Sequence, residues 1–290
     1  MERAAVDENW SNIMKKGIQK TIMERLHILG TGNAMVTECF NTCFVLEDNE
    51  RYLLVDTGGG NGILARLKEA GIGIHQLGHI FISHNHIDHI LGAIWLIRAY
   101  GAYVTGKPEH MNLKIYAHKG VVDIVNNMID MLLNKKQSKS LEGKLEFVEI
   151  GDGRQVDIFD WHLRFFDILS TKDKQFGFNM KLASGKKLVF LGDEPYRDAF
   201  ESFSTQADYM LHEAFCLYSD RESFKPYAKH HCTVKDACEN GEKLKVKNLI
   251  IYHTEDKNYR QRKDLYKSEG QAYYKGNLFV PYDLEVIDLV

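Results

Sequence analysis

The residues best suited to chemistry lie together in one hexapeptide, His84-Asn85-His86-Ile87-Asp88-His89. Three imidazoles and a carboxylate within six positions suit zinc, and also iron or manganese. In an extended loop His84 and His86 would point the same way, because side chains alternate along an extended chain. Asp88 and His89 would begin a helix, where an acidic residue is also a natural N-cap. The hexapeptide therefore predicts ligands for one or two adjacent metal ions.

The segments around the hexapeptide predict the elements that must position it. Apolar residues at 78–83 predict a buried strand before it, and those at 90–97 predict a core helix after it, running to about Tyr100. The polar segment 134–139 predicts a solvated loop. The pattern predicts further helices near 62–70, 119–133, 196–204 and 233–243, and strands near 25–29, 43–46, 52–55, 113–117, 145–150, 155–159, 161–169, 176–183, 187–191, 208–212 and 248–252. Sheets in both halves with helices between them predict an α/β fold, an αββα sandwich of two packed mixed β-sheets flanked by helices.

From about residue 24 onward the chain resembles the metallo-β-lactamase superfamily. The resemblance rests on the hexapeptide, the early turn at 30–32, Asp56 after an apolar strand, Asp193 in a Leu-Gly-Asp turn and His253 after another strand. It implies the fold of that family and a metal-dependent hydrolase. It further implies that His84 and His86 hold a first metal, that Asp88, His89 and His253 hold a second, and that Asp193 bridges the two.

A finer resemblance points to the ribonuclease Z and phosphodiesterase branch. Glu213 lies in Leu-His-Glu-Ala after a predicted strand, and His231 lies in His-His-Cys-Thr before a predicted helix. In that branch a glutamate and a distant histidine handle protons near the metals, and the resemblance assigns those roles to Glu213 and His231. His230 is the adjacent alternative for the histidine. Alternatively, Glu213 and His231 form a buried ion pair with only a structural role.

One ligand that the resemblance implies is missing. The family places a histidine about six residues before a Gly-aromatic pair, here Gly177-Phe178, and that position holds Thr171 next to Ser170. The lost ligand belongs to the first site. Because losing one of several protein ligands weakens a metal site without abolishing it, we expect zinc to bind more tightly at the second site than at the first.

The expected reaction is hydrolysis by a metal-activated hydroxide. Asp88 is both a ligand and the candidate base, while Glu213 and His231 would deliver a proton to the leaving oxygen. Such delivery suits a phosphodiester with a poor leaving group. A net charge of −3 and only the modest stretch 101–112 as a substrate arm favour a small or cyclic phosphodiester over transfer RNA. Lactone or thioester hydrolysis at the same metals is the alternative, and a non-catalytic metal or ligand sensor is another.

The rest of the chain predicts organisation and location. Residues 1–22 read as a peripheral arm or helix, and 23–290 as a single metallo-β-lactamase-like domain. No apolar run approaches the ~20 residues of a membrane span, and the acidic amino terminus lacks the apolar core of a signal peptide. The five cysteines include no Cys-x-x-Cys pair, which favours free thiols in a reducing compartment. A cytoplasmic protein follows, and the resemblance allows a homodimer.

Overall fold

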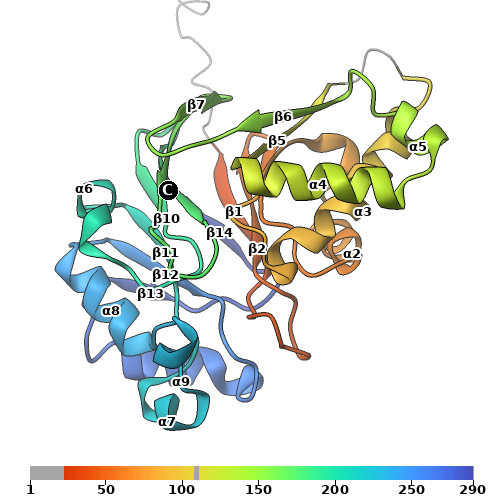
Figure 1. Cartoon of the computed structure of the whole chain (residues 1–290). Coiled ribbons are helices and arrows are strands. Elements are labelled where there is room, and N and C mark those ends of the chain that lie inside the picture. The colour runs from red at the N-terminus through yellow and green to blue at the C-terminus, as the bar shows by residue number, and fades with distance from the viewer. Residues whose placement is uncertain (1–22, 108–110, 290) are drawn as a thin grey trace, which may run out of the picture.

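The computed structural model describes residues 23–107 and 111–289, and the predicted arm at 1–22 lies outside them. Two mixed β-sheets, each of seven strands within the described residues, pack face to face (Figure 1). In spatial order the first sheet contains β14 (Val286–Asp288), β1 (Glu24–Gly30), β2 (Cys43–Asp48), β3 (Arg51–Val55), β4 (Leu77–Phe81), β5 (Leu113–Ala117) and β6 (Leu145–Glu149). The second contains β13 (Asn277–Phe279), β12 (Asn248–Tyr252), β11 (Tyr209–Glu213), β10 (Lys187–Phe190), β9 (Phe176–Lys181), β8 (Trp161–Asp167) and β7 (Gln155–Ile158).

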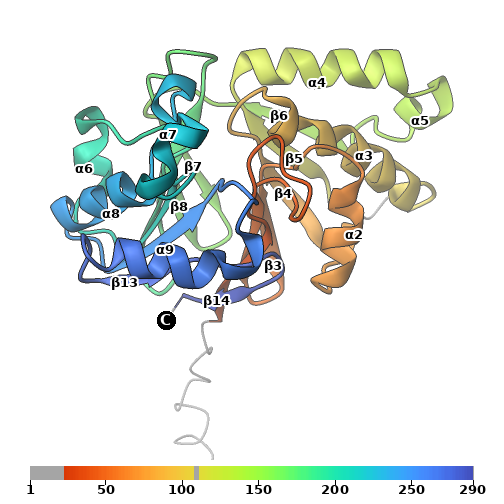
Figure 2. The same cartoon turned by 90° about the horizontal axis from the view of Figure 1, so that it is seen from below.

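Helices cover the outer faces of the two sheets (Figure 2). The first sheet carries α2 (Gly62–Glu69), α3 (Ile87–Val104), α4 (Lys119–Leu132) and the short α5 (Lys135–Lys139) on its side of the molecule. The second carries α6 (Glu201–Ser204), α7 (Arg221–Phe224), α8 (Val234–Lys243) and α9 (Arg262–Gly270). The predicted αββα sandwich is confirmed.

Strand β3 is buried on both faces, by helices on one side and by the second sheet on the other. Leu53 and Val55 are buried in the core between the sheets, whereas Leu54 is buried in the core under α2, α3 and α4. Successive strand residues point to opposite faces, so a strand covered on both sides reads as a continuous apolar run. A third core beneath α8 and α9 buries the outer face of the second sheet.

The parallel strands bring the predicted site residues to one edge. β3 is parallel to β4, and β10, β11 and β12 are parallel to one another. Ligands in α/β proteins bind outside the carboxyl ends of such strands. At these ends lie Asp56 after β3, His84 after β4, Asp193 after β10, Glu213 at the end of β11 and His253 after β12.

Two local predictions were wrong. Residues 135–139 form α5 instead of a loop, because Asn134 and Gln137 cap the helix reciprocally through side-chain bonds to each other's backbone amides. Helix α3 begins at Ile87 with His86 at the N-cap, so Asp88 lies within the first turn and is not the cap.

No helix in the described part of the chain is both long and apolar enough to cross a membrane.

Candidate metal centre and active site

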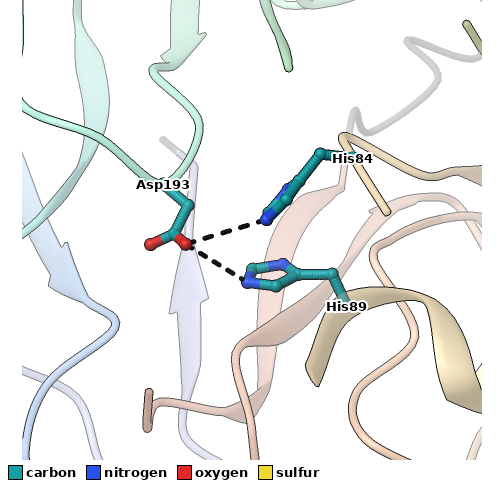
Figure 3. Close-up of side chains that lie close together, drawn as sticks. All are labelled: His84, His89 and Asp193. Carbon is teal, nitrogen blue, oxygen red and sulfur yellow. Dashed lines mark ion pairs between the residues drawn. The ribbon is translucent and has the colours of Figure 1, made fainter. Parts of the chain in front are cut away.

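Buried histidines and aspartates form three overlapping clusters at this edge. In each cluster the possible ligand atoms lie within 4.8 Å of one another. The clusters are His84 with His89 and Asp193, Asp88 with His89 and His253, and Asp193 with His231 and His253. Figure 3 shows His84 and His89 both directed at the Asp193 carboxylate. His89, Asp193 and His253 each belong to two clusters, so the clusters form one continuous centre.

Asp56 and Ser83 fix the orientation of two of these histidines. His89 Nδ1 lies 2.8 Å from Asp56 Oδ2, to which it donates a hydrogen bond when protonated. Ser83 donates to Asp56 and lies 2.9 Å from His84 Nδ1. Both rings therefore turn their Nε2 atoms toward the centre, the arrangement by which carboxylates and hydroxyls orient metal-binding histidines. Asp56 follows the last residue of β3 and has a left-handed φ of 58°.

Unsatisfied buried atoms show that a cation fits this centre. His84 Nε2 and His89 Nε2 are buried without a hydrogen-bond partner. Buried polar atoms are otherwise almost always paired. Ligand atoms on one tetrahedral zinc lie about 3.3–3.6 Å apart. Asp88 Oδ2 is 3.4 Å from both His89 Nε2 and His253 Nε2, and Asp193 Oδ2 is 3.8 Å from His84 Nε2.

The charges of the centre also suit metal binding. Burial acts to raise the pKa of Asp88, but His89 and His253 outweigh it and hold that pKa well below its ordinary range. Burial opposes ionisation of Asp193 as well, yet His253 and His231 hold its pKa low. Burial and the neighbouring His89 lower the pKa of His84, which keeps that ring neutral. Ionised carboxylates and a neutral imidazole are the forms that bind metals. The neighbouring carboxylates outweigh burial and raise the pKa of His89 and His253, so these two rings must release a proton when a metal binds.

His86 stands apart from the other predicted ligands. Within the described residues it belongs to none of the three clusters. Its ring centroid lies 4.4 Å from that of His84, and its Nε2 lies 3.2 Å from Asp173 Oδ2. No motif in the sequence marked Asp173 as a residue near the site.

Glu213 and His231 lie together beside the centre. Glu213 Oε1 accepts a hydrogen bond of 2.7 Å from the Cys232 amide, and Oε2 lies 3.7 Å from His231 Nδ1. His231 Nδ1 is also 3.8 Å from Asp193 Oδ1. The ring of Phe215 stacks on that of His231 at 5.1 Å and so holds its plane. His230 lies elsewhere, with its Nδ1 2.8 Å from the Thr171 hydroxyl.

A cleft of about 540 Å³ opens onto these residues. Its walls include Asp88, His231 and His253, together with Lys172 and Lys229. Two more lining side chains are apolar and exposed, namely Met35 at 84% and Ile87 at 63%. The sequence analysis assigned none of these four residues to the site, because which side chains line the cleft depends on which loops meet there.

A family model described as anti-Pycsar protein Apyc1 matches residues 24–272. The chain belongs to the anti-Pycsar protein Apyc1 family. Within the metallo-β-lactamase superfamily, this Apyc1 family member lies near the ribonuclease Z branch, as its sequence indicates. It is 24% identical to a protein named ribonuclease Z from Thermococcus sibiricus, over 90% of this chain and 95% of that protein.

Solved structures agree with the fold of this Apyc1 family member. The metallo-β-lactamase fold protein YhfI from Bacillus subtilis superposes with a TM-score of 0.73 at 17% identity, covering 92% of this chain and 100% of YhfI. The short form of human tRNase Z superposes with a TM-score of 0.70 at 18% identity, covering 92% of this chain and 99% of the human protein. At such low identities these likenesses establish the fold alone.

Proposed function

We propose that the chain is a metal-dependent hydrolase of a small or cyclic phosphodiester. The observation that carries this proposal is the Glu213–His231 pair beside Asp193, at a cleft lined by Asp88 and His253. A zinc ion held by the clustered residues would lower the pKa of a coordinated water from 15.7 to about 7 and thereby supply the nucleophile. His84, His86, Asp88, His89, Asp193 and His253 are the proposed metal ligands. Iron or manganese would suit the same donors.

The chain's own residues then manage the protons. Asp88 is the proposed base that receives the proton of the attacking water. His231 delivers a proton to the leaving oxygen, and Glu213, whose Oε2 lies 3.7 Å from His231 Nδ1, orients that ring. Phe215 restricts the rotation of the His231 ring. Positioned proton transfer of this kind contributes about 10²–10⁴-fold to rate.

The cleft and its surroundings support a small substrate. Its volume of about 540 Å³ lies within the range of small-molecule sites, about 300–1,000 Å³. Lys172 and Lys229 would neutralise one phosphodiester charge. Helix α3 ends at Val104 and β5 begins at Leu113, so residues 105–112 leave little chain for a long arm that holds RNA.

A transfer RNA precursor is the second candidate substrate. It is favoured by the likeness to a protein named ribonuclease Z, which covers 90% of this chain. Parallel assays on 3′,5′-cyclic nucleotides, bis(p-nitrophenyl) phosphate and a transfer RNA precursor separate the two. We expect chelator-sensitive turnover of the small esters and little cleavage of the precursor. Efficient precursor cleavage would reverse the order of the candidates, and turnover of lactones or thioesters alone would refute phosphodiester hydrolysis.

The proton-delivery role predicts a dependence on the leaving group. Glu213→Gln and His231→Asn should lower kcat on a cyclic nucleotide by about 10²–10⁴-fold, because its alkoxide needs a proton. The same variants should change p-nitrophenolate release far less, since that group leaves without protonation. His162→Asn is the matched control, because His162 is exposed and its ring pairs with the exposed Asp157. Equal losses on both esters would contradict general-acid catalysis by this pair.

A further inference from the structure

One peptide group carries the aspartate that is proposed to bridge the two metals. It links Gly192 to Asp193, and its carbonyl and amide point in opposite directions, as in any trans peptide. The Tyr252 hydroxyl donates a hydrogen bond to the carbonyl, Gly192 O. The amide, Asp193 N, donates to Gln175 Oε1 at 3.3 Å. Two buried side chains from different parts of the chain thus hold the two ends of one peptide group.

The backbone of this turn needs such support. Gly192 has a left-handed φ of 79°, and a Cβ at this position would lie 3.1 Å from Ile168 Cδ1. Glycine suits this conformation, but it also leaves the backbone freer to rotate than any other residue does. The direction in which the next residue, Asp193, projects therefore depends on contacts from outside the turn.

The Asp193 carboxylate has little tolerance for rotation. Its Oδ2 lies 3.8 Å from His84 Nε2 and 3.7 Å from His89 Nε2, the two rings drawn in Figure 3. Its Oδ1 lies 2.8 Å from His253 Nδ1. The two oxygens thus face histidines that follow strands of different sheets. A rotated peptide group would turn at least one of these oxygens away from its histidine.

Gln175 is a costly residue at its position unless its side-chain oxygen has a role. Its Nε2 is buried and has no hydrogen-bond partner among the described residues. Because burying an unpaired donor lowers stability, an apolar side chain of similar length would avoid that loss. The backbone on both sides is fixed, since Ile168 N donates to Gln175 O and Phe176 N donates to Ser83 O. This anchored segment delivers Oε1 to the amide of Asp193.

We propose that Gln175 and Tyr252 are positioning residues that clamp the Gly192–Asp193 peptide group and so hold the Asp193 carboxylate between the two predicted metal sites. Neither side chain lines the cleft, so both act through Asp193. The inference rests on the proposed metal-dependent function. Because Asp193 is shared by the two sites, loosening the clamp weakens both metals together.

The test is calorimetric titration of the metal-free protein with Zn²⁺. Gln175→Met and Tyr252→Phe should each lower the affinity of every equivalent that the wild type binds, by about 10–100-fold. Both hydrogen bonds restrain the same peptide group, so the two losses should be coupled. The loss in the double variant should therefore differ from the product of the single losses by at least about threefold.

The chain offers a matched control for each substitution. Tyr274→Phe removes another buried tyrosine hydroxyl that donates to a backbone carbonyl, Val246 O at 2.9 Å. Gln76→Met removes another glutamine oxygen that accepts from a backbone amide, Gly73 N at 2.8 Å. Neither control residue lines the cleft, and both variants should bind metal as the wild type does.

Urea unfolding of the same metal-free proteins separates positioning from a structural role. A structural role alone would lower stability and leave the affinity of the folded variants unchanged, and this result would overturn the inference. A loss confined to one of two equivalents, or single losses that simply multiply, would overturn it as well. If Tyr252→Phe does not fold, Gln175→Met alone decides. Wild-type protein that takes up no metal refutes the proposed function, whereas inactive protein with the predicted affinity losses refutes hydrolysis and leaves the clamp standing.

Discussion

At the scale of single residues, the centre depends on side chains that never touch a substrate. Asp56 contacts both Ser83 and His89, and Ser83 contacts His84. One carboxylate thus sets the direction of two rings, one in each predicted metal site. These hydrogen bonds connect Asp56 to both ends of the loop that carries the hexapeptide.

Asp56→Asn should lower metal affinity by about 10–100-fold, because the amide no longer attracts the His89 Nδ1 proton or stabilises its orientation. Asparagine tolerates the left-handed backbone at this position, so the fold should survive. Calorimetric titration of metal-free protein provides the measurement, with the exposed Asp123→Asn as control. Equal affinities in Asp56→Asn and wild type would show that the orientation of His89 is set elsewhere.

His79 supplies a pH dependence that is separate from the metal centre. It lies on β4 against Tyr116, and burial together with Lys114 lowers its pKa from 6.5 to about 4. The unfolded chain therefore takes up a proton first as pH falls. Stability from this group is complete above pH 6.5 and is lost as pH falls from 6.5 toward 4, by up to about 3 kcal/mol.

His79→Phe keeps the stacking on Tyr116 and cannot titrate, so its free energy of unfolding should fall less over this window. Urea unfolding of metal-free wild type and variant at pH 7, 5.5 and 4.5 gives the difference. Parallel curves for the two proteins would mean that His79 is not a source of acid sensitivity.

At the scale of elements, the start of α3 is fixed against the turn after β3. Thr57 N donates to His89 O, and Gly92 N donates to Gly58 O, both across short distances of 2.8 and 2.9 Å. A Cβ on Gly92 would lie 1.9 Å from Thr57 O, which is backbone and has no room to move. Glycine at this position lets the helix carry Asp88 and His89 close to the centre.

Gly92→Ala should destabilise the fold by about 1–3 kcal/mol and weaken metal binding, because the helix must move away from the turn. Gly120→Ala on α4 is the control, since that exposed position meets only the His118 side chain. Denaturant unfolding and metal titration provide the two readings. Full stability in Gly92→Ala would show that the turn adapts at little cost.

Elements with strong local signals could be predicted from the sequence, and those defined by tertiary pairing could not. β5 has the predicted bounds 113–117, because a short apolar segment between two helical patterns is typical of a buried strand. Strands β13 and β14 and helix α9 were not predicted. The two strands have only three residues each, too few for a periodic pattern, and exist because neighbouring strands pair with them. Likewise, the approach of Asp173 to His86 depends on loop geometry that residue types do not encode.

At the scale of the whole molecule, the metal centre joins the two halves of the sandwich. His84, Asp88 and His89 follow β4 in the first sheet, whereas Asp193 and His253 follow β10 and β12 in the second. The core between the sheets draws side chains from both halves. We propose that residues 23–290 form a single domain which unfolds in one step.

Removing metal should therefore lower the melting temperature without splitting the transition. A ligand at 1,000 times its dissociation constant stabilises the native state by about 4 kcal/mol. Calorimetric melting with and without a chelator measures the shift, and His89→Ala should reduce it by removing a shared ligand. Two separate melting transitions would contradict the single domain, and a chelator-independent melting temperature would contradict the bridging role of the metals.

The pairing of β14 with β1 matters for how the protein is made. The first of the described strands, β1, is hydrogen-bonded in the finished sheet by β2 on one side and by β14, from 286–288, on the other. While the intervening chain is being synthesised, that second edge of β1 stays open, and open strand edges invite pairing with other chains. The pairing of β1 is thus completed only after residues 286–288 have been synthesised, and until then one edge of β1 is open to contact with other chains.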